Sequence, residues 1–426
     1  MHSGRKDTDA ADEGIVPGMV LHYDRLPDPP PMPSPSAPFS ARRFLTTALL
    51  AALAPIATAA VEPEDVSPAW SHTTSGPIFS SPTHADGELY IGSDDRHLHA
   101  LETRTGSLRW TRALPHAVRS QPWVDEDAVL VVSGNTLTAL SRATGDELWA
   151  FAPDDARGTT PTDRWDYHTS SPVCTGGVVY YGGGNGAFYA IDRQSGAPKF
   201  TFETDGASAI RSKAAIADGV AFFGDWEGVL YAVDTATGQL RWKQPTVLGT
   251  KPYPNFGGAV SAVKVHEGRL YFGLRNPEVL CLDAHTGARV WTFTAENGSW
   301  VAGTPVLDAG TVYITGSDDH RVHALDTDSG AERWFCDVGQ NMFLAPLVTG
   351  DHLIVGDANS YTDDAGAGRL HVINRATGRI ERTITTGGNV GTSSPVLADG
   401  RVILGSEDGR VLAYHLSDLI SVPRSP

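Results

Sequence analysis

The sequence predicts an all-β fold, an eight-bladed β-propeller whose blades are four-stranded antiparallel sheets. Three observations predict it. A unit of roughly 40–50 residues recurs eight times along the chain of 426 residues. Each unit holds short runs of alternating apolar and polar residues separated by glycine turns, which is the pattern of strands with a buried face. The last unit lacks the tryptophan strand that ends most others, whereas Trp70 stands alone before the first unit.

The unit at residues 311–334, TVYITGSDDHRVHALDTDSGAERW, shows the pattern most fully. Strict alternation within VYIT and VHAL indicates two strands, and AERW begins a third. Asp326 and Gly330 bracket a tight turn, since a carboxylate accepts backbone N–H bonds and glycine adopts positive φ without steric cost. Such a unit is too small to bury both of its faces, so units arranged radially are expected to cover one another.

Three columns of equivalent positions register the units against each other. Small residues recur in the third strand at Ala100, Ala139, Ala190, Ala232, Cys281, Ala324, Val372 and Ala413. The turn glycines are Gly106, Gly145, Gly196, Gly238, Gly287, Gly330 and Gly378. An aromatic residue follows four positions later in six units, at Trp110, Trp149, Phe200, Trp242, Trp291 and Trp334. We expect these aromatic side chains, together with Trp70, to fill the outer gaps and dock each blade on the next.

The segment 66–74 is expected to complete the last blade and to close the ring, because closure removes exposed sheet edges. Trp70 then supplies the tryptophan that the eighth unit lacks. On this interpretation the propeller spans residues 66–418, and residues 419–426 form a C-terminal tail.

Residues 1–41 are polar and proline-rich without periodicity, and we expect them to be a disordered extension. Residues 42–59 combine an arginine pair, a short apolar run and an Ala-Thr-Ala site, which predicts a signal peptide cleaved after Ala59. The apolar run is too short for a stable membrane span, and a buried N-terminal helix is the alternative. The arginine pair leaves the Sec and Tat routes open. We therefore expect an exported monomer that is extracellular, cell-wall associated or periplasmic.

The formal net charge of −17 is spread along the chain without long acidic blocks. Such a surface argues against nucleic acid or an anionic lipid surface as the main partner. The three cysteines, Cys174, Cys281 and Cys336, are too widely spaced for a disulfide framework or a zinc site.

Two runs, AVDTATGQLRW at 232–242 and ALDTDSGAERW at 324–334, resemble the repeat of the PQQ-like β-propeller family. The resemblance extends over residues 66–418 and implies the eight-bladed fold. The family includes quinoprotein dehydrogenases, the outer-membrane assembly scaffold BamB and the sensor ends of some bacterial kinases. The resemblance is therefore much more specific for the fold than for the function.

An enzyme of this family would carry features that can be sought in the sequence. Quinoprotein alcohol dehydrogenases resemble one another in a vicinal Cys-Cys pair beside the quinone, and this chain has no adjacent cysteines. It has neither a C-x-x-C-H haem site nor a G-x-S-x-G nucleophile elbow. The acidic pairs fall in predicted turns and the histidine pairs on distant units: Asp94-Asp95, Asp318-Asp319, His97/His99 and His320/His323. We assign no catalytic residue, metal site or cofactor; the alternative is a dehydrogenase that binds PQQ with Ca²⁺ and oxidises alcohols or sugars.

Blade-to-blade linkers and the middle turn of each blade emerge on one side of a propeller, which we call the linker face. Here that face is irregular in length and gathers aromatic and arginine residues. The candidate binding residues are Arg119, Trp165, Tyr167, His168, Arg211, Trp226, Tyr253, Phe256, Trp300 and Phe343. Exposed aromatic and arginine side chains are typical of binding hot spots. The alternative is that these aromatics pack over the linkers or plug the channel.

The sequence thus predicts a non-catalytic scaffold that binds another protein or a cell-envelope component through the linker face. Carbohydrate binding by the same aromatics is a further option. Serine recurs at one inner position of six units, where we expect it to line the crowded axis and not to contact a ligand. These residues are Ser80, Ser120, Ser170, Ser212, Ser261 and Ser393.

Overall fold

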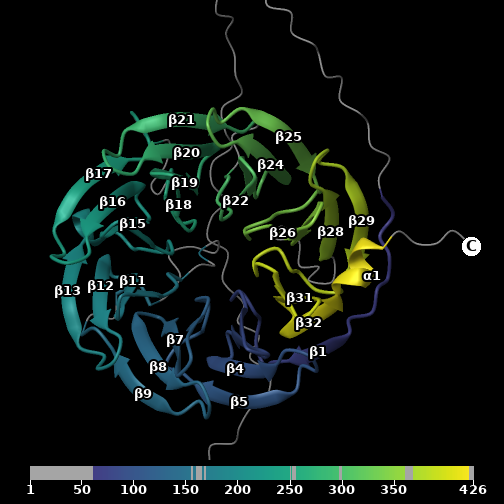
Figure 1. Ribbon diagram of the computed structural model, residues 1–426, viewed down its shortest axis with the longest axis horizontal. Helices are drawn as coiled ribbons and strands as arrows, with labels where there is room; N and C mark the ends of the chain where they lie inside the picture. The colour runs from purple at the N-terminus through teal and green to yellow at the C-terminus, as the bar shows by residue number, and fades with distance from the viewer. Residues whose placement is uncertain are drawn as a thin grey trace, which may run out of the picture. The chain divides into compact units, whose positions relative to one another are not determined.

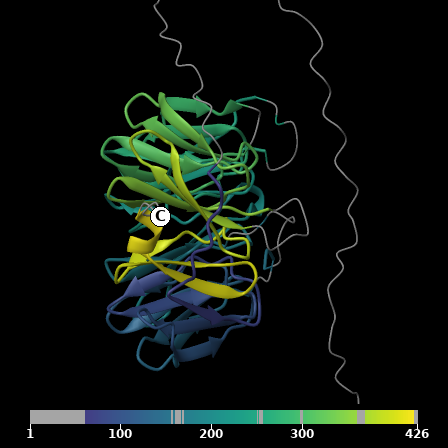
Figure 2. The same cartoon turned by 90° about the vertical axis from the view of Figure 1, so that its right-hand side faces the viewer.

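The computed structural model describes residues 61–154, 157–159, 166, 169–249, 251, 256–296, 300–359 and 368–421. Within these ranges the chain forms eight four-stranded antiparallel sheets, arranged as blades around an axis (Figure 1). Figure 2 shows the same ring from the side. The predicted fold class is confirmed. The predicted extension at 1–41 and signal peptide at 42–59 lie outside the described residues.

Every blade places its strands in the same order from the axis outward. The innermost strands are β2 (Thr83–Ala85), β6 (Trp123–Val124), β10 (Val173–Thr175), β14 (Ala215–Ala217), β18 (Lys264–His266), β22 (Val306–Asp308), β26 (Leu347–Thr349) and β30 (Val396–Ala398). The second strands are β3 (Glu88–Gly92), β7 (Ala128–Ser133), β11 (Val178–Gly182), β15 (Val220–Gly224), β19 (Arg269–Gly273), β23 (Thr311–Thr315), β27 (His352–Gly356) and β31 (Arg401–Gly405).

The outer half of each blade is built from two longer strands. The third strands are β4 (His97–Glu102), β8 (Thr136–Ser141), β12 (Ala187–Asp192), β16 (Val229–Asp234), β20 (Glu278–Asp283), β24 (Arg321–Asp326), β28 (Arg369–Asn374) and β32 (Arg410–His415). The outermost strands are β5 (Leu108–Ala113), β9 (Glu147–Phe151), β13 (Pro198–Glu203), β17 (Leu240–Pro245), β21 (Arg289–Thr294), β25 (Glu332–Asp337), β29 (Ile380–Thr385) and β1 (Trp70–Thr73). A 3₁₀ turn, η1 (Asp205–Ala207), and a short helix, α1 (Leu416–Ile420), complete the described elements.

The core lies between adjacent blades and not within any one of them. In β16, for example, four consecutive residues are buried, so both faces of the strand are covered. Phe222 and Leu230 of blade 4 pack against Leu270 and Leu280 of blade 5 in one apolar cluster. Burial on both faces explains why the middle strands are apolar almost throughout and carry small residues such as Ala232 at the closest approach.

The aromatic column docks seven of the eight blades, all but blade 7, on the blade that follows. Each ring lies against the turn glycine of the following blade; a Cβ on Gly145 would come within 2.6 Å of the Trp110 ring. Each tryptophan also donates its indole N–H to the carbonyl three residues before that glycine. The indole donors and their acceptors are Trp70 to Thr103, Trp110 to Arg142, Trp149 to Arg193, Trp242 to Ala284, Trp291 to Thr327 and Trp334 to Arg375, at 2.9–3.2 Å.

Phe200 is the aromatic of this column that has no N–H to donate. Its ring lies on Gly238, so the equivalent acceptor is the carbonyl of Thr235. We expect Phe200→Trp to raise the free energy of unfolding by about 1 kcal/mol through one new hydrogen bond. Chemical denaturation measures the change, and Trp149→Phe on the preceding blade should produce the opposite shift. Equal stability of both variants and the parent chain would contradict this account of the column.

The N-terminal strand closes the ring, also as predicted. β1 pairs antiparallel with β32, with Trp70 opposite Ala413, and lies beside it in Figure 1. The Trp70 ring rests on Gly106 of blade 1, so one residue joins the last blade to the first. Ser393 repeats the connection near the axis, where its hydroxyl donates to the Ser80 carbonyl at 2.8 Å.

Blade 7 departs from the aromatic column. Arg382 lies opposite Val372, where the other blades place tryptophan or phenylalanine. Its guanidinium donates to Glu64 at 3.0 Å and to the carbonyl oxygens of Leu419 and Ser421 at 2.9 and 3.1 Å. Helix α1 stands beside β29 in the place of a glycine turn (Figure 1). Both ends of the propeller are therefore held by one arginine.

The predicted C-terminal tail, residues 419–426, begins inside this helix, and Leu419 is fully buried. Residues 422–426 lie outside the described residues. Among the residues that the structure describes, no helix has the length and apolar character required to cross a membrane.

The serine column does not line the axis, so that prediction is wrong. Ser170 and Ser212 are fully buried, and their hydroxyls accept the backbone N–H of Gly182 and Gly224. The Ser170 hydroxyl donates in turn to the Ser212 carbonyl of the next blade at 2.8 Å. The column therefore joins inner strands, and the residue after each serine faces the axis instead.

Candidate functional site

The structure describes six of the ten residues predicted for the linker face. Trp165, Tyr167, His168 and Tyr253 lie outside the described residues. Arg119, Phe256 and Trp300 are half-buried. The expected exposure is wrong for Arg211, Trp226 and Phe343, which are at most 6% exposed. On the described part of this face, the predicted residues are thus largely packed into the surface.

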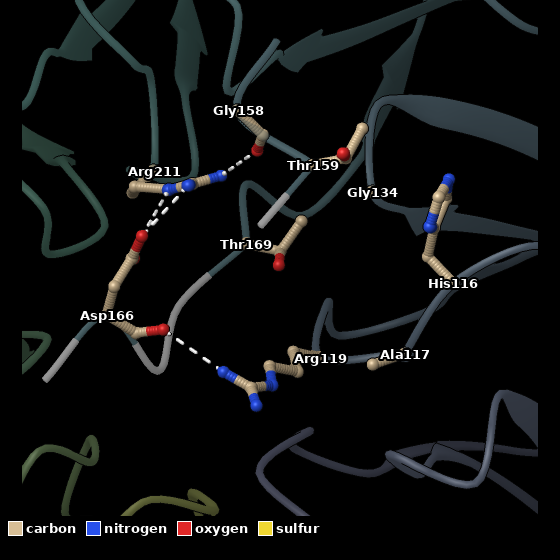
Figure 3. A pocket seen from close by; sticks show the side chains of 9 residues that line it. All are labelled: His116, Ala117, Arg119, Gly134, Gly158, Thr159, Asp166, Thr169 and Arg211. Atoms are coloured by element: carbon tan, nitrogen blue, oxygen red, sulfur yellow. Dashed lines mark hydrogen bonds and ion pairs between the residues drawn. The ribbon is translucent and has the colours of Figure 1, made fainter. Parts of the chain in front are cut away.

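Asp166 connects two of the predicted arginines. Its carboxylate accepts the Nε and Nη2 donors of Arg211 at 3.2 and 2.8 Å, while its backbone carbonyl accepts Nη1 of Arg119 at 3.1 Å (Figure 3). The side chains of Asp166 and Arg211 are 1% and 5% exposed. Arg119 also holds both carboxylate oxygens of Asp94 at 2.7 and 2.9 Å. This network joins Asp166 to the linkers that carry Arg119 and Arg211 and, through Arg119, to Asp94 of blade 1.

Trp226 and Trp300 meet around a cation that the sequence analysis missed. The Arg275 guanidinium lies 4.1 Å from the centre of each ring, so the three side chains form a stack from blades 4 and 5 and the linker before blade 6. Trp226 also packs on Val260 and Ala302. Desolvated cation–π contacts of this kind stabilise an arginine in a fixed position. The sequence does not indicate this contact, because the three residues belong to different blades and linkers and meet only in the folded propeller.

A cavity of about 270 Å³ occupies the axis of the ring. All eight blades contribute one residue from the position that follows the serine column. These residues are Ser81, Gln121, Ser171, Lys213, Ala262, Thr304, Ala345 and Ser394. Lys264, Arg119, Arg211 and Phe343 also line the cavity. We call this space the central channel.

The acidic turns and histidines form structural pairs within single blades. The Nε2 atoms of His99, His323 and His371 lie 3.2, 2.8 and 2.9 Å from carboxylate oxygens of their own blades. His323 also contacts Glu332 at 2.7 Å. Burial opposes its protonation, but the bonds to Asp319 and Glu332 outweigh burial and raise the pKa of His323. These pairs tie the middle turn to the third strand, as turn chemistry predicts.

Sequence comparison relates the chain to curated proteins over most of its length. The outer membrane protein assembly factor BamB of Yersinia pestis is 30% identical over 344 residues, which cover 80% of this chain and 71% of that protein. The chain belongs to the BamB-like family. The family model described as outer membrane protein assembly factor BamB matches residues 54–244. BamB of Salmonella typhimurium is 25% identical over 350 residues, covering 81% of this chain and 73% of that one.

Structure comparison finds the same fold in an enzyme. Quinohemoprotein alcohol dehydrogenase from Comamonas testosteroni superposes with a TM-score of 0.64 and 15% identity, over 86% of this chain and 80% of that one. At this identity the likeness of the enzyme to this BamB-like chain concerns the fold alone.

The described residues do not fit a quinone and calcium site. Cys174, Cys281 and Cys336 are free thiols on three different blades, so none forms a vicinal pair. In the described ranges no group of three or more His, Cys, Asp or Glu side chains is placed to hold a metal ion. Ca²⁺ takes carboxylate and carbonyl oxygens, whereas the charged residues that line the central channel are arginines and lysines. We derive no reaction step through PQQ.

Proposed function

We propose that this BamB-like propeller is an exported, non-catalytic scaffold that binds another protein of the cell envelope through its linker face. The sequence relation to the outer membrane protein assembly factor of Yersinia pestis, 30% identity over 80% of the chain, carries the proposal. The PQQ-dependent dehydrogenase remains the alternative, and no observation on the described residues favours it.

The stack of Trp226, Arg275 and Trp300 gives this proposal a physical basis. Trp300 is the outer, half-buried ring of the stack, and its position is fixed by the buried guanidinium beneath it. Leu248, in the preceding linker, is 70% exposed. In the same linker, Gly257 donates its N–H to the Arg275 carbonyl at 3.2 Å. A half-buried aromatic ring held in a fixed position is typical of an anchor for a protein partner, because little conformational entropy is lost on binding.

Trp300→Ala is expected to weaken capture of the partner about 10–30-fold, which corresponds to loss of one hot spot of about 2 kcal/mol. The measurement is a pull-down from the native envelope fraction with purified parent and variant chains, followed by titration with the captured protein. Leu148→Ala serves as a matched control, because Leu148 is 52% exposed on the outermost strand of blade 2, away from the linker face. Equal capture by the parent, Leu148→Ala and a Trp300→Ala/Leu248→Ala double variant would refute the proposal.

The alternative is tested separately by adding PQQ and Ca²⁺ to the full chain. We expect no bound-quinone spectrum and no dye reduction with alcohols or sugars. Either signal would replace the scaffold proposal by the dehydrogenase.

A further inference from the structure

The central channel is lined by positive charge without matching negative charge. Four of its lining residues are cationic, Arg119, Arg211, Lys213 and Lys264, and none of the lining residues is Asp or Glu. Arg119 and Arg211 form ion pairs with Asp94 and Asp166, which do not line the channel. The lysines have no such partner: across the described part of the chain, neither ammonium group forms an ion pair with a carboxylate.

Lys213 and Lys264 belong to adjacent blades that touch at the axis. The Val263 N–H donates to the Lys213 carbonyl at 3.2 Å, which brings the two lysines together. The Lys213 ammonium donates to the Gln121 amide oxygen at 3.0 Å, across blade 3. Burial, and for Lys213 the charge of Lys264, lowers the pKa of both groups, that of Lys213 to about 8. Two half-buried like charges that face each other without a counter-ion are costly, and a bound anion would reduce that cost.

The remaining channel residues supply hydrogen-bond donors. The hydroxyl oxygens of Ser81, Ser171, Thr304 and Ser394 each accept a backbone N–H from an adjacent blade, at 2.9–3.3 Å. Each hydroxyl therefore still has its own proton to donate, and no described residue accepts it. Four hydroxyl donors and two ammonium groups that line the same cavity match a ligand that carries only acceptors.

We propose that the central channel is a binding site for a small oxyanion, a phosphate or carboxylate group held between Lys213 and Lys264. Ammonium groups bind such groups as point charges, and hydroxyl donors complete their hydrogen bonding. A volume of about 270 Å³ admits a small polyanion and is below the usual range for drug-sized ligands. Trp300, the proposed protein anchor, is not among the residues that line the central channel, so neither proposal depends on the other.

Calorimetric titration of the full chain with inorganic pyrophosphate and with citrate tests the site and distinguishes the two sources of the anion. We expect saturable one-to-one binding of at least one probe and a rise in melting temperature on its addition. Lys213→Met/Lys264→Met should abolish binding. The melting temperature of the unliganded double variant should equal or exceed that of the parent chain, because two half-buried charges that repel each other are gone. Purely structural lysines would instead give a lower melting temperature.

Lys199→Gln is the matched control for the change in charge, since Lys199 lies on the outermost strand β13 and is 46% exposed. It should bind both probes as the parent does. Affinity should also fall as the pH rises from about 7 to about 9, because Lys213, facing Lys264 and Gln121, loses its proton near pH 8. Absence of saturable binding of both probes, or full binding by the double variant, overturns the proposal.

Discussion

Asp166→Ala is expected to lower the free energy of unfolding by about 3–5 kcal/mol, the largest effect of a single substitution on the described linker face. The substitution removes the carboxylate from the buried Arg211 guanidinium, which also donates to the Gly158 carbonyl at 3.1 Å (Figure 3). A buried charge without its carboxylate partner stays desolvated but loses the Coulombic attraction that offset this desolvation. Equilibrium denaturation in urea measures the difference.

Two further variants make this prediction specific. Glu147→Ala removes the partner of Arg112 in a half-exposed ion pair and should lower the free energy of unfolding by about 0–1 kcal/mol. Asp166→Ala/Arg211→Met should be more stable than Asp166→Ala alone, since no buried charge remains. If Asp166→Ala lowers the free energy of unfolding by less than about 1 kcal/mol, solvent reaches Arg211 and the pair behaves as an exposed one.

Trp70→Ala is expected to lower the free energy of unfolding by about 3–5 kcal/mol. It removes a large buried side chain and the indole hydrogen bond to Thr103 where the last blade meets the first. The glycine beneath the ring provides a second, independent test. Gly106→Ala and Gly87→Ala place a Cβ at nearly the same positive φ, +71° and +79°. The two variants therefore share the cost of backbone strain.

They differ in what the new Cβ meets. At Gly106 it would lie 2.4 Å from the Trp70 ring, and at Gly87 nothing lies within 4 Å. We expect Gly106→Ala to melt at a clearly lower temperature than Gly87→Ala in thermal scans followed by circular dichroism. Equal melting temperatures would show that Trp70 moves aside easily and that ring closure does not depend on this contact.

The repeat made most of the fold predictable. Trp70, the turn glycines and the small third-strand residues occur in register because every blade faces the same packing problem. Equivalent positions that carry different residue types in different blades cannot be recognised in this way. The position after the serine column lines the axis in all eight blades, yet its residue is Ser, Gln, Lys, Ala or Thr, so no column is visible in the sequence. Lys213 and Lys264 could have been noticed as two of only six lysines in the chain.

The site was less predictable because its partners come from different blades. Residue type predicts Arg211 as an exposed binding residue, whereas its pairing with Asp166 joins two linkers 45 positions apart in the sequence. Arg275 was missed because its two aromatic neighbours lie 49 positions before it and 25 positions after it, as the numbers of Trp226 and Trp300 give. The residue types alone indicate arginines and tryptophans that could bind a partner. Which of these side chains contact one another is determined by the geometry of the turns and linkers in the folded chain.

Closure of the circle by its own first strand also sets the order of assembly. The bond between Ser393 and Ser80 joins residues 313 positions apart, so its contact can form only after nearly the whole chain is available. Contacts of such long sequence separation form slowly, and until β1 docks, the outer edge of β32 stays unpaired and can associate with other chains. We therefore expect closure of the seam to be a late step of folding and the interval before it to favour misassembly.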